Sequence, residues 1–377
     1  MNILQVIPYY WPALTFGGPV KVTYELVNEL VINNDVTVYT SDAWDGKRRM
    51  KASEMLENKG NFKVYYFKNL IYSVAFSHRI YTNFGILTSF IRQSKQYDVI
   101  HLNDVFSIPQ IILAKLAHLI GIPYIVSTHG VDMTGNIRKM AIKSILYKYF
   151  VSGMLKSAKF VIATSGGEAM ILKKLGYLNT RIVYNGVKVE NHKSKKRLKT
   201  KPFTILYLGR INRLKGLTSL IDAIKDLQFS IKLKIAGPDD GDKNNLKSMI
   251  TEYGIKDKVE FLGFVDGKIK ENLYKKTDVF VYPSSLEGFS ISILEAMEHS
   301  LPVIITKECN FPDVAKYNAG YVLENKNLSL QIENAIKELY NNKSKINEMS
   351  KNARKLILNK YSINVMARNI EKLYAKT

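Results

Sequence analysis

The chain has 377 residues, of which 46% are hydrophobic and 11% aromatic, and its formal net charge is +22 at pH 7. This length is too great for one typical domain, and the composition excludes a disordered chain. The excess of lysine and arginine runs through both halves of the sequence. It favours anionic partners such as nucleic acid, an anionic lipid surface or phosphorylated small molecules. A lysine-rich surface that only solvates the protein explains the charge equally well.

The beginning of the chain, MNILQVIPYY, lacks the basic and long apolar regions of a signal peptide. The most apolar window, residues 108–126, contains Lys115 and two prolines, which favours a buried helix, a turn and a strand over a membrane span. The single cysteine, Cys309, cannot form an internal disulfide. We therefore expect a reducing, cytoplasmic setting.

Short β-branched runs alternate with helix-length segments along the first half of the chain. Helices are expected near residues 20–31 and 137–156. The expected strands are NILQVI, DVTVYT, FKVYYF, DVIHLN, YIVST and FVIATS. Near-continuous apolar strands separated by helices predict a parallel sheet covered on both faces.

Three loops of this first half carry candidate site residues. Gly17 and Gly18 precede a proline suited to a first helical turn, and they permit close approach of a ligand to the backbone. His129, in YIVSTHGVD, follows a strand and could donate a hydrogen bond or transfer a proton, or it could simply be satisfied in a turn. His101 and Asp104, in DVIHLND, are acceptor-side candidates for which a structural role is an equal alternative.

A polar, basic segment at residues 187–202 lacks an amphipathic period and is interpreted as a linker. After it, strands are expected at FTILYLG, IKLKIAG, KVEFLGF, DVFVYPS and PVIIT, and residues 328–377 are expected to be helical. Helices between these strands are expected to start near Lys215, Asp242, Asp266 and Ser290. The pattern predicts two α/β domains with parallel sheets that face a central cleft, with ligands at the carboxyl ends of strands.

Basic and glycine residues follow three strands of the second domain. Arg210 and Lys215 straddle a strand-to-helix loop in LYLGRINRLKG and could bind one anion together, although a basic surface loop would look the same. Gly237 and Gly263 end two further strands. The Gly237 loop could line the cleft or only make a turn, and a backbone edge at Gly263 could hydrogen-bond a flat ring, although the sequence does not require it.

The segment SLEGFSISILEAM contains Glu287 and Glu295, with seven residues between them. The same spacing occurs at Glu252 and Glu260, which share no loop or helix start, so spacing alone indicates nothing. Around the first pair a serine is expected to cap a helix, and the first amides of that helix form a potential anion site. The residues expected at this helix start are Gly288, Phe289, Ser290 and Ile291. A further serine and glutamate in ATSGGEAM, Ser165 and Glu168, fit a capping box.

With these motifs together, the chain resembles the retaining glycosyltransferases of the two-Rossmann-domain GT-B fold, known as group 1 or family 4. The resemblance covers nearly the whole chain. It depends on FGGP, STHG, YNGV, LGR with KG, and EGFSISILEAM. Two features depart from the family pattern: EHSLPV lacks the usual glycine after the helix, and KECNFPD keeps only Pro312 and Asp313 of a Gly-Gly-Pro-Glu-like loop.

The resemblance implies a role for each matching residue of the second domain. Arg210 and Lys215 would hold the donor diphosphate, assisted by amides after Gly288. Glu287 would contact hydroxyls of the donor sugar, and Glu295 would bind the nucleotide ribose. From the first domain, Gly17 and Gly18 would approach the phosphates, and His129 would contact the transferred sugar near its anomeric carbon. No metal and no cofactor are expected; the donor, a UDP- or GDP-sugar, is a substrate.

The resemblance also implies the domain functions. The predicted parts are an N-terminal Rossmann-like acceptor domain at 1–190, a linker at 191–201, a C-terminal nucleotide-sugar-binding domain at 202–360, and a helix at 361–377 that packs on the first domain. The predicted enzyme is a metal-independent hexosyltransferase that retains anomeric configuration and acts on a glycan or lipid-linked acceptor in cell-surface polysaccharide biosynthesis.

The predicted location is the cytoplasm, with peripheral association to the inner face of the membrane. Residues 137–156 are basic on one side and could touch anionic lipid, although packing in the core is the favoured interpretation. The runner-up function is a nucleotide-sugar epimerase or sugar-phosphate synthase on the same fold. A nucleic-acid-binding protein is a remote alternative that no motif supports, and no nucleic-acid partner is expected.

Overall fold

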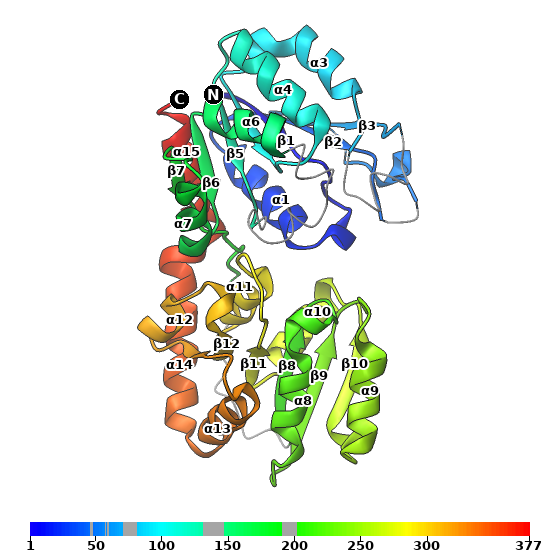
Figure 1. The fold of residues 1–377 in the computed structure, drawn as a ribbon, viewed down its shortest axis with the longest axis vertical. Coiled ribbons are helices and arrows are strands. Elements are labelled where there is room, and N and C mark those ends of the chain that lie inside the picture. The colour runs from blue at the N-terminus through cyan, green and yellow to red at the C-terminus, as the bar shows by residue number, and fades with distance from the viewer. Residues whose placement is uncertain (46–47, 57, 59, 71–80, 131–146, 191–201) are drawn as a thin grey trace. The chain divides into compact units, whose positions relative to one another are not determined.

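The computed structural model describes residues 1–45, 48–56, 58, 60–70, 81–130, 147–190 and 202–377 (Figure 1). The chain forms two compact units. One comprises Met1–Lys188 with Ile363–Thr377, and the other comprises Val189–Ser362. Each unit is an α/β domain with its own parallel sheet, which confirms the predicted fold class. The predicted linker at 191–201 lies outside the described residues.

In the described part of the first unit, the strands form a parallel sheet in the order β3-β2-β1-β4-β5-β6-β7. These strands are β1 (Asn2–Val6), β2 (Asp35–Ser41), β3 (Phe62–Phe67), β4 (Val99–Asn103), β5 (Tyr124–Ser127), β6 (Phe160–Ala163) and β7 (Thr180–Ile182). The α-helices are α1 (Gly18–Leu30), α3 (Gly85–Gln93), α4 (Ile108–Leu119), α6 (Ser152–Ser157), α7 (Gly166–Lys174) and α15 (Ile363–Tyr374). The strand order reverses between β1 and β4.

In the described part of the second unit, the order is β10-β9-β8-β11-β12-β13. The strands are β8 (Phe203–Leu208), β9 (Ile231–Ala236), β10 (Val259–Gly263), β11 (Val279–Tyr282), β12 (Val303–Thr306) and β13 (Gly320–Leu323). The α-helices are α8 (Leu217–Lys225), α9 (Lys243–Glu252), α10 (Gly267–Lys275), α11 (Ile291–Glu298), α12 (Asp313–Lys316), α13 (Leu328–Asn341) and α14 (Lys343–Leu356). Here the order reverses between β8 and β11.

The predicted strands are all present, and their ends agree within two residues. Two edge strands, β7 and β13, were not predicted, because each is short and only partly buried. The helical tail is confirmed, with α13, α14 and α15 covering most of it. Of the helix expected at 137–156, residues 137–146 lie outside the described residues, and α6 begins at Ser152.

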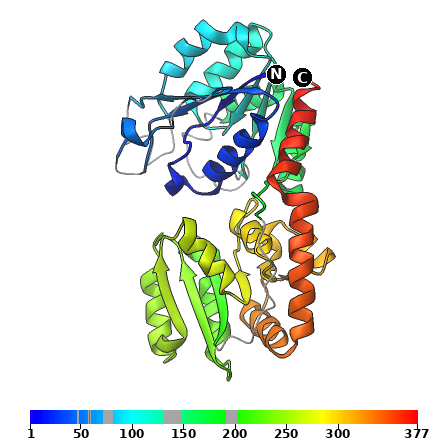
Figure 2. The same ribbon diagram turned by 180° about the vertical axis from the view of Figure 1, so that it is seen from behind.

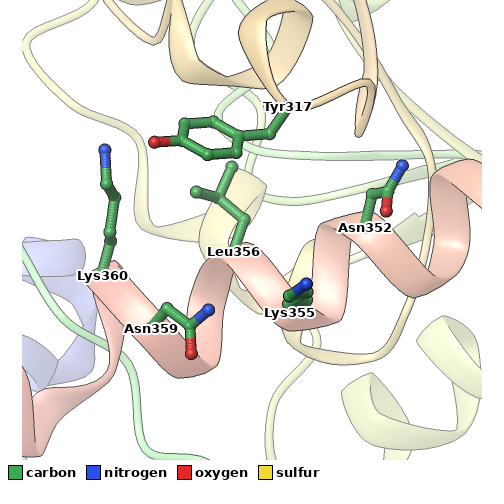
Figure 3. A pocket seen from close by; sticks show the side chains of 6 residues that line it. All are labelled: Tyr317, Asn352, Lys355, Leu356, Asn359 and Lys360. Carbon is green, nitrogen blue, oxygen red and sulfur yellow. The ribbon is translucent and has the colours of Figure 1, made fainter.

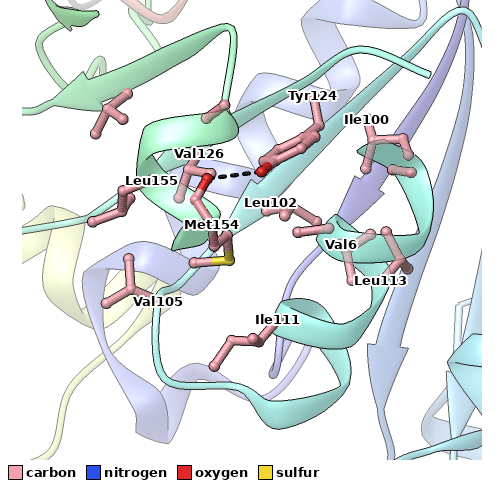
Figure 4. Packing of buried hydrophobic residues seen from close by; sticks show 14 of the residues in the cluster. Val6, Ile100, Leu102, Val105, Ile111, Leu113, Tyr124, Val126, Met154 and Leu155 are labelled. Carbon is pink, nitrogen blue, oxygen red and sulfur yellow. Dashed lines mark hydrogen bonds between the residues drawn. The ribbon is translucent and has the colours of Figure 1, made fainter. Parts of the chain in front are cut away.

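The core of the first unit is built from alternate side chains of its central strands, since neighbouring residues of a strand point to opposite faces. Val6 of β1 lies in one buried cluster with Leu113 of α4 and Leu155 of α6 (Figure 4). The hydroxyl of Tyr124 donates a hydrogen bond of 2.8 Å to the Met154 carbonyl within this cluster. The strand residues between these apolar positions therefore face the opposite side of the sheet.

The C-terminal helix α15 belongs to the first unit, where it packs on α1 (Figure 2). Asn364 donates to Glu29 of α1 at 2.7 Å, and near the other end of the helix Glu371 accepts from Asn34 at 3.0 Å. The Ile363 amide donates to the Val187 carbonyl, at the end of the YNGV segment. In the described ranges, no helix is long and apolar enough to cross a membrane.

Candidate active site

The carboxyl ends of β8 and β11 are neighbours in the centre of the second sheet. In open α/β sheets, ligands bind where the strand order reverses, outside these ends. The loop after β8 carries Arg210 and Lys215, and the loop after β11 carries Glu287. Two sequence motifs that lie more than 70 residues apart therefore meet at one edge of the sheet.

Backbone contacts lock the two loops together. The Leu214 carbonyl of the first loop accepts hydrogen bonds from the Ser285 amide at 2.8 Å and the Ser284 hydroxyl at 3.1 Å. Gly216 has a φ of +67°, and a Cβ atom there would lie 2.0 Å from the Pro283 carbonyl oxygen. The glycine of the KG motif is thus required both by its backbone conformation and by the close approach of the second loop.

Lys215 and Glu287 form an ion pair at this junction. The Lys215 Nζ lies 2.7 Å from Glu287 Oε1, and the two side chains are 10% and 18% exposed. The same carboxylate oxygen accepts a hydrogen bond of 2.5 Å from the Tyr282 hydroxyl. Burial, and next the charge of Glu287, hold the pKa of Tyr282 well above its usual value, so this hydroxyl stays a donor. Lys215, predicted to bind phosphate, and Glu287, predicted to contact the donor sugar, are therefore paired with each other in this structure.

Gly209, which directly follows β8, leaves room for the packing of two tyrosines. The rings of Tyr207 and Tyr282 stack with centroids 5.4 Å apart. A Cβ atom on Gly209 would lie 2.8 Å from the Tyr207 hydroxyl and 3.0 Å from a Tyr282 ring carbon. Its φ is not positive, so a left-handed turn does not require glycine here. The close approach of the two rings is the physical reason.

Arg210 lies beside the stacked rings of Tyr207 and Tyr282, and its side chain is 54% exposed. Its Nη1 lies 3.4 Å from Asp240 Oδ2, which is a loose contact for an ion pair. Its backbone is fixed more firmly, because the Arg210 carbonyl accepts a hydrogen bond of 2.7 Å from the Tyr207 hydroxyl. The guanidinium is therefore anchored at its base and loosely held at its tip.

Gly237 and Gly263 connect the ends of three adjacent strands. The Gly237 amide donates to the Gly263 carbonyl at 2.7 Å. Gly237 has a φ of +138°, and a Cβ atom there would lie 1.9 Å from the Gly209 carbonyl oxygen. The Gly263 carbonyl, which the sequence suggested as a partner for a flat ring, is thus already an acceptor within the protein.

Replacing Gly237 with alanine should lower the free energy of unfolding by at least about 1–3 kcal/mol, because it adds backbone strain and a steric clash with Gly209. The measurement is urea denaturation followed by circular dichroism. Gly241→Ala is the matched control, since Gly241 also has a positive φ, +97°, but faces open space. Equal losses in both variants would contradict the close-approach explanation.

Helix α11 begins at Ile291, as predicted, with Ser290 as its first flanking residue. The Ser290 hydroxyl lies 3.0 Å from the Ser292 hydroxyl and makes no capping bond to the backbone, so its predicted capping bond is wrong. The Phe289 side chain is buried among aromatic rings. Within the described residues, the amides of Gly288, Ser290 and Ile291 have no protein acceptor. They form a positive end of the helix dipole beside Glu287.

Glu295 is buried inside α11, where it is 7% exposed. Its Oε1 accepts from Lys270 at 2.8 Å, and its Oε2 accepts from the Tyr274 hydroxyl at 3.1 Å. Both donors lie on α10, four residues apart on one face. Each glutamate of the motif thus has its own lysine and tyrosine partner. Sequence reasoning missed Lys270, Tyr274 and Tyr282, although the spacing of the first two is a signal for a shared target.

In the first unit, Gly17 has a φ of +90° and Gly18 is the first residue of α1, with proline in the first turn as predicted. A Cβ atom on Gly17 would meet open space, so its conformation alone requires glycine. Asp104 accepts hydrogen bonds from the Val105 and Phe106 amides, which gives its carboxylate a role in the loop.

The two candidate histidines differ in their surroundings. His129 is half-buried, its Nε2 lies 3.1 Å from Asn103 Oδ1, and burial lowers its pKa to about 4. His101 is 1% exposed, and its ring nitrogens contact the Tyr374 hydroxyl at 2.8 Å and the Ser127 hydroxyl at 2.7 Å. Burial lowers the pKa of His101 to about 3. The sequence suggested that His101 contacts the acceptor substrate, but this side chain is too deeply buried for such a contact.

Glu168 holds the loop around His129. Its carboxylate accepts hydrogen bonds from the Thr128 hydroxyl at 2.5 Å, the Gly130 amide at 2.8 Å and the Thr164 amide at 2.7 Å. Half of the predicted capping box is present, because the Ser165 hydroxyl accepts from the Glu168 amide at 3.2 Å. In a full capping box the Glu168 carboxylate would accept from the Ser165 amide, but here it accepts from the Thr164 amide. The same carboxylate also binds Thr128 and Gly130, the two neighbours of His129.

A pocket of about 240 Å³ lies elsewhere in the second unit, between α12 and the end of α14 (Figure 3). Tyr317 covers one side, and the other side is lined by residues of the C-terminal helical segment: Asn352, Lys355, Leu356, Asn359 and Lys360. None of the predicted site residues lines this pocket.

Comparison with known families assigns both units. Residues 16–191 match the model of Glycosyltransferase Family 4, and residues 188–356 match the model of Glycosyl transferases group 1. The chain therefore belongs to the glycosyltransferases, and it is a transferase enzyme.

Three known proteins illustrate the similarity. The chain is 28% identical over 253 residues to the GDP-mannose:cellobiosyl-diphosphopolyprenol alpha-mannosyltransferase of Xanthomonas campestris, covering 65% of each chain. It is similar in structure to Anabaena HepE in complex with UDP and glucose, with a TM-score of 0.74, 18% identity and full coverage of both chains. The sucrose-phosphate synthase of Thermosynechococcus elongatus has a TM-score of 0.77 at 19% identity, covering 100% of this chain and 98% of that one. In the first relatives found by sequence, the match spans 61% to 71% of the relative's own length.

Proposed function

We propose that the protein transfers a sugar from a nucleoside-diphosphate sugar to a glycan or lipid-linked acceptor, with retention of anomeric configuration. The observation that carries this proposal is the Lys215–Glu287 pair at the junction of β8 and β11, beside the positive end of α11. The proposal is supported by the name of the Xanthomonas relative, which gives GDP-mannose and a cellobiosyl-diphosphopolyprenol, and by the UDP and glucose bound to HepE. We place the reaction in cell-surface polysaccharide biosynthesis, at the inner face of the membrane.

Cleavage of a nucleotide sugar builds negative charge on the departing diphosphate and positive charge on the anomeric carbon. Lys215, Arg210 and the free amides of Gly288, Ser290 and Ile291 are positive groups at one edge of the sheet. Such fixed donors stabilise a developing anion strongly in a site that excludes water. In this proposal they bind the diphosphate, and Glu295 binds the ribose.

The ion pair suggests how donor binding is accommodated. Lys215 is held by Glu287 in this structure, at 2.7 Å. When a diphosphate arrives, its charge competes for the lysine, and the carboxylate of Glu287 becomes available to hydroxyls of the donor sugar. Tyr282, which donates to the same oxygen, keeps the carboxylate in place during this exchange.

We propose that transfer needs no metal, as the family resemblance implies, with the cationic groups neutralising the diphosphate. Transfer measured with and without EDTA should give equal rates. A loss of activity with EDTA that Mg²⁺ restores would contradict metal independence.

A sugar-phosphate synthase is a second candidate, because the similar structures include a sucrose-phosphate synthase. The two candidates differ in the acceptor. Incubation with UDP- and GDP-sugars, together with polyprenyl-diphosphate glycans or sugar phosphates, followed by product mass spectrometry, separates them. Release of nucleoside diphosphate without mass gain on any acceptor would contradict the proposed transfer.

Replacing Arg210 with alanine should lower kcat/KM for the donor by about tenfold to 100-fold while the thermal unfolding temperature stays unchanged. The side chain is exposed and loosely paired, so the fold loses little, whereas the diphosphate loses a bidentate donor. Initial-rate kinetics and a thermal melt measure both quantities. Normal donor turnover in this variant would show that Arg210 does not bind the diphosphate.

A further inference from the structure

A buried chain of hydrogen bonds joins the C-terminal helix to His129 in the first unit. Gln5 of β1 and His101 of β4 are register partners, on the face of the sheet opposite Leu4 and Leu102. Tyr374, in the last turn of α15, is 1% exposed and places its hydroxyl between them. That hydroxyl lies 2.8 Å from Gln5 Nε2 and 2.8 Å from His101 Nδ1.

The next link, Asn103, has an amide orientation that its surroundings fix. Its Nδ2 lies 2.9 Å from Gln5 Oε1, and 3.4 and 3.3 Å from the carbonyl oxygens of Val6 and His101. Backbone carbonyls only accept hydrogen bonds, so the atom facing two of them must be the amide nitrogen. The Asn103 Oδ1 is then the atom that faces His129.

This orientation decides which ring nitrogen of His129 carries the proton. The His129 Nε2 lies 3.1 Å from Asn103 Oδ1, and an amide oxygen accepts only. Nε2 must therefore be protonated. Because burial lowers the pKa of His129 to about 4, the ring is neutral near pH 7, and Nδ1 carries a lone pair.

We propose that Tyr374, Gln5 and Asn103 are positioning residues that hold His129 in its Nε2–H tautomer, so that Nδ1 accepts a hydrogen bond from a substrate hydroxyl. The contact with substrate rests on the proposed function; the tautomer does not. Glu168 adds to this positioning, because it binds Thr128 and Gly130 on either side of His129. From the sequence, His129 could donate a hydrogen bond, transfer a proton or be satisfied in a turn; in this proposal its Nε2–H donates to Asn103 and its Nδ1 is the acceptor for the substrate.

The tautomer is measured by long-range ¹H–¹⁵N correlation NMR on the full chain labelled with ¹⁵N-histidine. The chain has six histidines, and the His129 signals are assigned by their loss in His129→Gln. The expected result near pH 7 is the pattern of an Nε2–H ring. An Nδ1–H pattern for His129 would overturn the proposal, whether or not transfer activity has been found.

The variants test the positioning role. Asn103→Leu should replace the single pattern of His129 by a mixture of tautomers and lower kcat about tenfold, with the KM for the donor unchanged. Tyr374→Phe should act in the same direction with a smaller effect, and it serves if Asn103→Leu does not fold. Tyr124→Phe is the matched control, since it loses one hydrogen bond of 2.8 Å in the same unit, outside the network.

Failure of the positioning role and failure of the proposed function give different results in these NMR and kinetic measurements. If the wild-type protein transfers no sugar, the NMR pattern in wild type and variants still decides the tautomer. If transfer is found, a variant with unchanged His129 signals and unchanged kcat would overturn the positioning role while leaving the proposed function intact. Equal effects of Tyr124→Phe and Tyr374→Phe on the His129 signals would also overturn it.

Discussion

Replacing Lys215 with alanine should lower kcat/KM for nucleotide-sugar transfer by about 100- to 1000-fold, the usual effect of losing one electrostatic donor to a developing anion. Lys215 is the more buried of the two cationic candidates at the β8 end, and Gly216, immediately after it, fixes the loop against Pro283. Its ammonium therefore occupies a defined place. Initial rates over a range of donor concentrations measure the effect.

The matched control is Arg213→Ala in the same loop. Arg213 is 87% exposed and lies 3.9 Å from Asp242, so its removal should change kcat/KM less than twofold. Lys215→Ala should also lower the unfolding temperature slightly, because it leaves the largely buried carboxylate of Glu287 without its cation. Equal activity of the Lys215 and Arg213 variants would contradict the assignment of the diphosphate site.

Replacing Glu295 with alanine should raise the KM for the donor by roughly 10- to 100-fold, the value of a hydrogen bond to a charged group. The carboxylate is buried and oriented by Lys270 and Tyr274, so it is preorganised as an acceptor for ribose hydroxyls. We expect a smaller effect on kcat, because the ribose is remote from the bond that breaks. Donor-saturation kinetics separate the two quantities.

Glu252→Ala provides the control for this variant. Glu252 stands at the same spacing from Glu260 as Glu287 does from Glu295, but it is exposed at the end of α9. Its replacement should leave the KM for the donor unchanged. If the Glu295 variant binds donor as the wild type does, Glu295 has a structural role in joining α10 to α11, and the ribose assignment is wrong.

The alternation of apolar strands with helices was enough to predict the fold class and the positions of most strands. Apolar runs such as FTILYL are nearly fully buried in parallel sheets, and burial on both faces gives a strong signal in the sequence. The edge strand β7 lacks this signal, because Arg181 and Ile182 are exposed. Its pairing with β6 depends on the sheet already being formed.

The loop residues of the site were predictable from the sequence, whereas the partners Lys270, Tyr274 and Tyr282 and the pairing itself were not. Strand ends and a helix start placed Arg210, Lys215 and Glu287 at strand-end loops from the sequence alone. That Lys215 binds Glu287 depends on the order of β8 and β11 in the sheet, which the sequence does not specify. Likewise, a side chain at Gly209 is excluded by two tyrosine rings that meet only in the folded unit.

The central claim is that the second unit binds a nucleotide sugar through the Lys215 site. The most direct measurement is the thermal shift of the wild-type protein and Lys215→Ala with UDP-, GDP-, ADP- and CDP-sugars. A ligand at 100 times its dissociation constant adds about 2.7 kcal/mol to the free energy of unfolding. We predict a clear shift of the wild type with a UDP- or GDP-sugar and little or none in the variant. No shift with any donor, or an equal shift in both proteins, would contradict the claim.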